Sequence, residues 1–158
     1  MKIVLYQNVG KDVSFLGVDS LLCSGFQIPL FFLGQKLRRF RAENRLLWST
    51  AILTVAMLII ASAESAATVL LGHVLLSSAY PVLLIAMRNI VSDTVDLKLQ
   101  TTANGLCDAF YSSLSGIFAM SYTGVVLEQY GVKPLLGICL GFYFAASIVC
   151  LVRYIRKR

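Results

Sequence analysis

The sequence predicts an all-α fold, a polytopic transmembrane helix bundle of about five spans. Composition is the first reason, because 58% of the 158 residues are hydrophobic and only 14% are charged, whereas a soluble domain has about 25% charged residues. The second reason is a mean hydropathy of +0.77. The third is that apolar residues gather in runs close to the roughly 20 residues that a helix needs to cross a bilayer.

The expected spans follow one another with short polar stretches between them. A polar lead at 1–12 precedes a bundle at 13–158, and its spans are placed at 13–33, 46–62, 68–91, 102–127 and 134–152. Pro81 lies in the third span, where a membrane helix tolerates a kink. The second and fifth spans contain no ionisable residue, and a helix that is apolar on every side is expected to face lipid.

The distribution of positive charge predicts the orientation of the bundle. The connector at 34–45 contains five basic residues, namely Lys36, Arg38, Arg39, Arg41 and Arg45, and short basic loops are retained in the cytoplasm. Eleven of the fourteen Lys and Arg residues, including those of the cytoplasmic tail at 153–158, fall on the same side of the expected spans. The lead at 1–12 is therefore expected outside the cell. The net charge of +6 then reflects topology and contact with lipid headgroups, and no nucleic-acid partner is expected.

Neither an enzyme nor a bound cofactor is expected. The sequence has no His-Glu-x-x-His and no glycine-rich phosphate loop. The four cysteines lie inside apolar segments without paired spacing. Disulfide frameworks and zinc sites use close pairs in polar loops, so these cysteines are expected to act as small buried hydrophobes and no metal site is predicted.

Ionisable side chains are confined to the first, third and fourth spans, where each belongs to a polar stripe at helical spacing. The stripes are Asp19, Cys23 and Gln27; His73, Ser77 and Tyr80; and Asp108, Ser112 and Ser115, with Tyr111 beside them. Because an ionisable group at membrane depth costs about 2.5–3.5 kcal/mol on insertion scales, such groups face the bundle interior or water. We expect the three stripes to converge on one hydrated cavity that forms the wall of a solute pathway.

Each ionisable residue also has a simpler interpretation. Asp19 is close enough to the outer end of its span to reach the aqueous interface. His73 can be a neutral imidazole bonded to a neighbouring carbonyl group, and Arg88 can extend to the inner interface. Asp108 is the hardest to explain in this way, because it lies inside its span among apolar neighbours and favours a functional or ion-pairing role.

Three segments resemble the major facilitator superfamily of transporters. The connector Gly34-x-x-x-Arg38-Arg39-Phe40-Arg41 is similar to the family's loop motif, Gly-x-x-x-Asp-Arg/Lys-x-Gly-Arg/Lys, with Gly34 and Arg39 in register. Arg38 replaces the motif's Asp, and Arg41 replaces its second Gly. Gln27-Ile28-Pro29 resembles the Glu-Ile-Pro of lactose-permease-like members, although Gln27 cannot take up a proton. Residues 102–106, with Gly124 and 128–131, are similar to the eleventh helix and its exit turn.

The resemblance implies that the spans correspond to helices eight to twelve of a twelve-helix carrier in the plasma membrane. The partner would be the missing N-terminal half, in the same gene or a separate chain, and the function would be proton-coupled transport of a small solute such as a sugar by alternating access. The proton-coupling candidates are Asp108, His73 and Asp19. The candidate solute contacts are Gln27, Tyr80, Asn104 and Tyr111.

A second function is also consistent with the sequence. Gly137 and Gly141 form a Gly-x-x-x-Gly pattern in the fifth span, and this spacing lets helices approach closely. The chain is then a small membrane protein that transports nothing and acts by helix–helix association with a partner.

Overall fold

The computed structural model describes residues 15–36 and 39–156, and the regular structure in these ranges is entirely helical. The predicted all-α fold is therefore confirmed. The α-helices are α2 (Phe15–Lys36), α3 (Ala42–Ala61), α4 (Ala66–Thr94), α5 (Gln100–Ala109), α6 (Ser115–Tyr130) and α7 (Val132–Arg156). Within the described residues, α2, α3, α4 and α7 are long and apolar enough to cross a membrane, which indicates a membrane protein. The lead at 1–12 lies outside the described residues.

The fourth expected span, 102–127, is not one uninterrupted α-helix. The segment consists of α5, a five-residue π-helical turn η3 (Phe110–Leu114), and α6. None of the α5 residues is buried. A π-helical turn of this kind is often found at functional sites. It also explains why neither α5 nor α6 is by itself long enough to span a bilayer.

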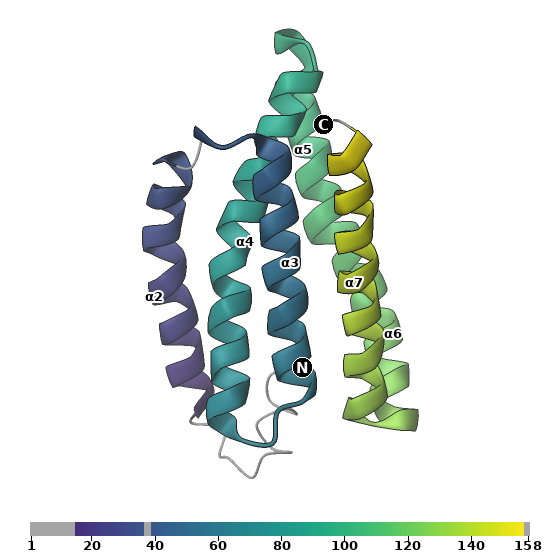
Figure 1. Ribbon diagram of the computed structural model, residues 1–158. Coiled ribbons are helices and arrows are strands. Elements are labelled where there is room, and N and C mark those ends of the chain that lie inside the picture. Colours follow the sequence, from purple (N-terminus) through teal and green to yellow (C-terminus); the bar gives the residue numbers. More distant parts are fainter. Residues whose placement is uncertain (1–14, 37–38, 157–158) are drawn as a thin grey trace.

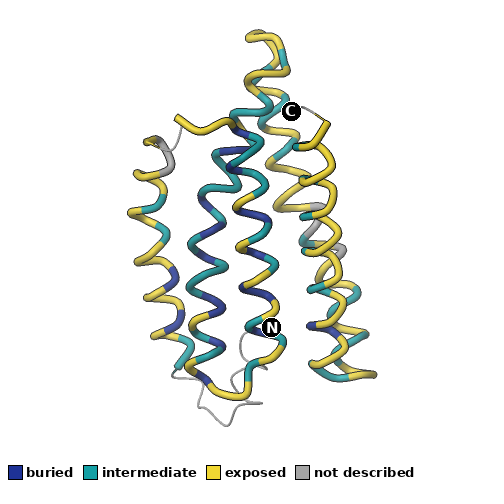
Figure 2. Tube along the Cα trace, viewed as in Figure 1, coloured by how far each residue is buried: buried dark blue, intermediate teal, exposed yellow. Residues whose placement is uncertain are grey.

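Helices α3 and α4 form the centre of the bundle (Figure 1). Helix α2 packs on α4, whereas α7 packs on α3 and carries α6 on its other side. Buried residues are concentrated on α3 and α4 (Figure 2). The apolar core includes Met57, Ile60, Val69 and Leu136. Polar contacts supplement it, because Thr54 Oγ1 lies 2.8 Å from Ser147 Oγ of α7.

The expectation that the second span lies at the outside of the bundle, against lipid, is wrong for one side of α3 only, because Trp48, Val55 and Leu58 are more than half exposed. Helix α3 has eight buried residues, spread along its length from Ala42 to Ile60. A helix that is apolar on every side is equally suited to the middle of a bundle, and the absence of charge does not distinguish the two positions. The fifth span does match its expectation, because only Leu135 and Leu136 are buried in α7.

The basic connector and the end of the chain lie at the same end of the bundle. Helix α2 ends there, α3 begins there, and the last turn of α7 lies at the same level (Figure 1). Lys36 is in the last turn of α2, and Arg153 and Arg156 are in the last turn of α7. We call this the basic end. The turn between α3 and α4 lies at the opposite end, where Ser65 caps α4 by accepting a hydrogen bond from the Thr68 amide at 3.3 Å.

Candidate functional site

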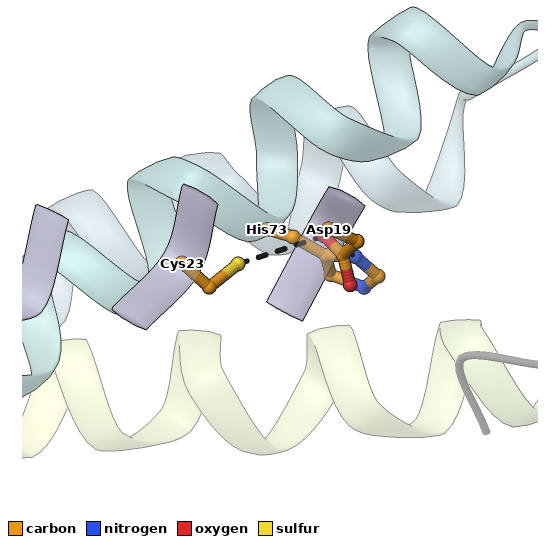
Figure 3. Close-up of polar contacts among 3 residues, drawn as sticks. All are labelled: Asp19, Cys23 and His73. Atoms are coloured by element: carbon orange, nitrogen blue, oxygen red, sulfur yellow. Dashed lines mark hydrogen bonds and ion pairs between the residues drawn. The ribbon is translucent and has the colours of Figure 1, made fainter. Parts of the chain in front are cut away.

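The polar stripes of α2 and α4 meet in a buried acid–histidine pair. His73 Nδ1 lies 3.1 Å from Asp19 Oδ1, and Cys23 donates its S–H to the same carboxylate oxygen at 3.5 Å. Asp19 is 0% exposed and His73 is 7% exposed. Figure 3 shows Asp19 and Cys23 projecting from α2 toward His73 of α4. The structure therefore brings together two of the three proton-coupling candidates.

Close packing of α3 against the other side of α4 supports this arrangement. Gly72, the neighbour of His73, faces α3 without a side chain. A Cβ atom at this position would clash with the Ile60 side chain and would lie 3.1 Å from the Ala56 carbonyl oxygen. The missing side chain lets α3 and α4 approach closely, while the next residue, His73, reaches α2.

The chemistry that this geometry allows is the binding and release of a proton. A carboxyl group and an imidazole within hydrogen-bond distance can share one proton, so that the pair has no net charge. Release of that proton leaves one negative charge in surroundings from which water is excluded. Such a change is costly in an apolar interior, and histidine is the side chain that ordinarily titrates between pH 5 and 8. The geometry is thus suited to gaining and losing a proton when its access to water changes.

Asp108, the third proton-coupling candidate, is in a different environment. Its Oδ2 accepts a hydrogen bond from Arg88 Nη2 at 3.2 Å, and the two side chains are 53% and 61% exposed. Arg88 adjoins Asn89, whose amide oxygen, in its favoured orientation, accepts from Arg45 Nη2 at 2.6 Å in the first turns of α3. The Arg88–Asp108 ion pair therefore lies near the basic end. The ion-pairing role expected for Asp108 is observed.

Two of the candidate solute contacts meet between these sites. The rings of Tyr80 and Tyr111 have centroids 5.7 Å apart. Tyr80 lies at the centre of the 29-residue helix α4, and Tyr111 belongs to the π-helical turn η3. Ser112 and Ser113, next to Tyr111, are exposed. A polar surface thus lies halfway along the bundle.

The three stripes do not converge on a single cavity. His73 and Arg88 are separated by fifteen positions on α4, about 22 Å of helical rise. The stripe of α2 meets α4 at His73, whereas the stripe of α5 and η3 meets α4 at Tyr80 and Arg88. The expected single cavity is therefore replaced by two separate contact regions on α4.

The remaining candidate solute contacts and the residues of the loop motif lie outside these two contact regions or at their edges. Gln27 is half-buried on α2 and makes no hydrogen bond to the described part of the chain. The Asn104 Oδ1 atom on α5 is buried, with no hydrogen-bond partner among residues 15–36 and 39–156. Gly34 lies in the last turn of α2, Arg38 lies outside the described residues, and Arg39 and Arg41 line a hollow at the basic end.

Arg45 is a site residue that charge patterning indicates only as a topology signal. The structure places it 6% exposed and in contact with Asn89. The available signal in the sequence is its position directly before the apolar run that starts at Leu46, because a long cation there can lie within the first turn of the helix.

No protein-family model matches the chain, and no curated protein or solved structure shows significant similarity to it.

Proposed function

We propose that the chain is part of a proton-coupled secondary transporter of the major facilitator type that carries a small solute across the plasma membrane. The observation that carries the proposal is the buried Asp19–His73 pair between two apolar helices of membrane length. Ionisable residues at membrane depth are costly and generally serve ion or substrate movement. Asp19 and His73 together are the proton site in this proposal, ahead of Asp108.

The polar surface near Tyr80 and Tyr111 supports a solute pathway. It lies at the middle of α4, and transporters bind their solutes near the bilayer midplane. Tyrosine rings and hydroxyl groups suit stacking and hydrogen bonding with a sugar. Asn104 contributes a buried acceptor on the same side of α4, in α5.

The exposure of this surface supports a partner. Tyr111 and the serines that follow it are exposed at mid-depth. Although Ser112 Oγ donates to the Asp108 carbonyl oxygen at 2.6 Å, polar side chains at this depth suit a protein neighbour or water better than lipid. In the proposal, this surface faces the missing N-terminal half, encoded in the same gene or as a separate chain, and the two halves alternate in exposing the solute site. The basic end is cytoplasmic, and the N-terminus is outside.

Reconstitution tests the proposal. The full chain, alone or with a co-expressed N-terminal half, is placed in vesicles that contain a pH-sensitive dye, and a hexose or a disaccharide is added outside. We expect solute-dependent acidification of the lumen. Asp19→Asn should abolish it, because the amide cannot take part in proton exchange, whereas the matched variant Asp108→Asn should retain it because Asp108 is in an exposed ion pair.

Acidification that persists in Asp19→Asn and is lost in Asp108→Asn would identify Asp108 as the proton-coupling residue and exclude Asp19. Folding is controlled by comparing the helix content of both variants with that of the natural chain. No proton movement with any solute, in vesicles that contain a folded chain and its other half, would exclude transport.

A second function, association through α7, is favoured by the surface of that helix. Gly137 and Gly141 have no atom within 4 Å of an added Cβ, so their backbone is open to another helix. Phe144 and Ile148, which share the helix face of Gly137 and Gly141, are 60% and 47% exposed. We infer that α7 is the contact surface if the chain acts by binding a membrane partner.

Energy transfer between labelled chains in lipid vesicles tests association. Gly141→Ile should reduce transfer strongly, because a branched side chain would keep two backbones apart. Ala146→Ile, also on the exposed surface of α7, is the matched control and should leave transfer unchanged. Equal transfer in both variants would exclude the Gly137–Gly141 surface.

A further inference from the structure

A groove lined by residues of α2, α3 and α4 takes no part in the proton site or the tyrosine contact. Its volume is about 410 Å³, within the range of pockets that hold small molecules. Helices α3 and α4 contribute most of the lining, and α2 contributes Leu30. Most of the lining is apolar: Leu30, Trp48, Ile52, Leu75, Ala79 and Val82.

A polar hollow at the basic end lies next to the groove. This hollow, of about 330 Å³, is lined by Arg39, Arg41, Arg45, Asn89 and Asp93. Phe40 and Arg45 belong to the lining of both spaces. The apolar groove and the charged hollow are therefore neighbours on either side of Phe40 and Arg45.

The hollow has an excess of positive charge. Three arginines line it against the single carboxylate of Asp93, and Glu43 in the first turn of α3 is the nearest further acid in the sequence. Arg41 occupies the N-cap of α3 without making a side-chain capping hydrogen bond. The positive end of the α3 dipole adds to the attraction for an anion.

Arg45 lines both the groove and the hollow. Its guanidinium group contacts the Asn89 amide oxygen, and its backbone carbonyl accepts a hydrogen bond from Ser49 Oγ at 2.7 Å. The side chain is held where the apolar groove begins. A ligand that fills both spaces must therefore place a negative group beside Arg45 and an apolar chain along α4.

We propose that this site binds one anionic phospholipid, with its phosphate among Arg39, Arg41 and Arg45 and an acyl chain in the groove over α4. The occupant must be amphiphilic, because the lining changes from apolar to cationic along its length. It is a lipid rather than a solute, because the groove is open on the side of membrane-length helices, where Trp48 is 69% exposed. Basic pockets between transmembrane helices bind anionic headgroups in this way.

Trp48 supplies the measurement, since it is the only tryptophan in the chain and it lines the groove. The full chain is placed in phosphatidylcholine vesicles that contain a small fraction of a brominated lipid, because bromine atoms on the acyl chains quench tryptophan fluorescence. The brominated lipid is phosphatidylglycerol in one series of vesicles and phosphatidylcholine in the other. The hollow has three arginines against one carboxylate, a net excess of two positive charges, and each such charge favours an anionic headgroup by about fivefold. We therefore expect half-maximal quenching at about a 25-fold lower fraction of brominated phosphatidylglycerol than of brominated phosphatidylcholine.

Two charge variants test whether the preference for phosphatidylglycerol comes from the hollow. Arg39→Gln/Arg41→Gln removes two exposed arginines of the hollow and should eliminate the preference for phosphatidylglycerol. Arg153→Gln/Arg156→Gln removes the same charge from α7 at the same end of the bundle and should preserve it. Circular dichroism checks that both variants remain helical.

Several results would overturn the proposal. Equal quenching by the two lipids in the natural chain would show that no anionic lipid is preferred. Equal loss in both charge variants would reveal a general charge effect instead of a site. Restoration of Trp48 fluorescence by inorganic phosphate would assign the hollow to a soluble anion rather than to a lipid.

Discussion

At the scale of single residues, the shared helix face of Asp19 and Cys23 was predictable from the sequence, whereas the pairing of Asp19 with His73 was not. The four-residue spacing of Asp19 and Cys23 correctly indicated one face of a helix, and their hydrogen bond is observed. The partner of Asp19 could not be read from spacing, because contact between α2 and α4 depends on tertiary packing. The same limit applies to Asp108, whose exposed pairing with Arg88 depends on where α5 meets α4.

Replacement of the pair by leucines predicts a measurable coupling. Asp19→Leu should destabilise the bundle, because His73 loses its hydrogen-bond partner, and His73→Leu should act similarly. The double variant should recover part of the loss, since two apolar side chains suit a buried site. We expect a coupling energy of about 1 kcal/mol, as found for polar contacts between membrane helices.

Unfolding in mixed micelles with rising dodecyl sulfate, followed by circular dichroism, gives the four free energies of unfolding. Additive effects of the two substitutions would contradict a direct interaction between the side chains.

At the scale of elements, the boundaries of most helices and the peripheral position of α7 were predictable, whereas the central position of α3 was not. The apolar runs correctly indicated α2, α3, α4 and α7 because length and hydropathy are local properties. The central position of α3 depends instead on small contact residues such as Ala56 and Gly72, which let α4 approach. The π-helical turn at Phe110–Leu114 also has no proline or glycine to announce it.

Gly72→Ala tests the close approach of α3 and α4. The added methyl group would collide with Ile60 and crowd the Ala56 carbonyl, so we expect a loss of about 1–3 kcal/mol in the free energy of unfolding. Gly25→Ala on α2, which meets no atom within 4 Å, is the matched control and should cause no loss. The dodecyl sulfate titration measures both, and equal stability of the two variants would contradict the predicted contact.

At the scale of the whole molecule, charge was the most informative property of the sequence. The basic residues of the connector and of α7 lie at one end of the bundle (Figure 1), as expected for loops that stay on one side of a membrane. Charge could not predict how the polar stripes meet, because α2 and α5 contact α4 at different levels. The orientation of the bundle therefore follows from the distribution of charge along the sequence, whereas the geometry of the site follows from how the helices pack.

Accessibility to an impermeant maleimide tests the orientation. In a variant whose four native cysteines are replaced by alanine, Ser65→Cys introduces a thiol in the turn between α3 and α4, and Lys98→Cys introduces one in η2 (Leu97–Leu99). We expect the thiol at position 65 to react in intact cells and the one at 98 to react only after permeabilisation. The reverse pattern would invert the proposed topology.

The most direct test of proton binding by Asp19 and His73 uses the fact that the chain has a single histidine. Nuclear magnetic resonance of the chain with ¹⁵N-labelled histidine in lipid nanodiscs gives one imidazole spectrum, which is recorded as the pH is changed. We expect reversible protonation of His73 that moves to a different pH in Asp19→Asn and is unaffected by Asp108→Asn. An imidazole that never titrates, or that responds to Asp108→Asn instead, would contradict the proposed proton site.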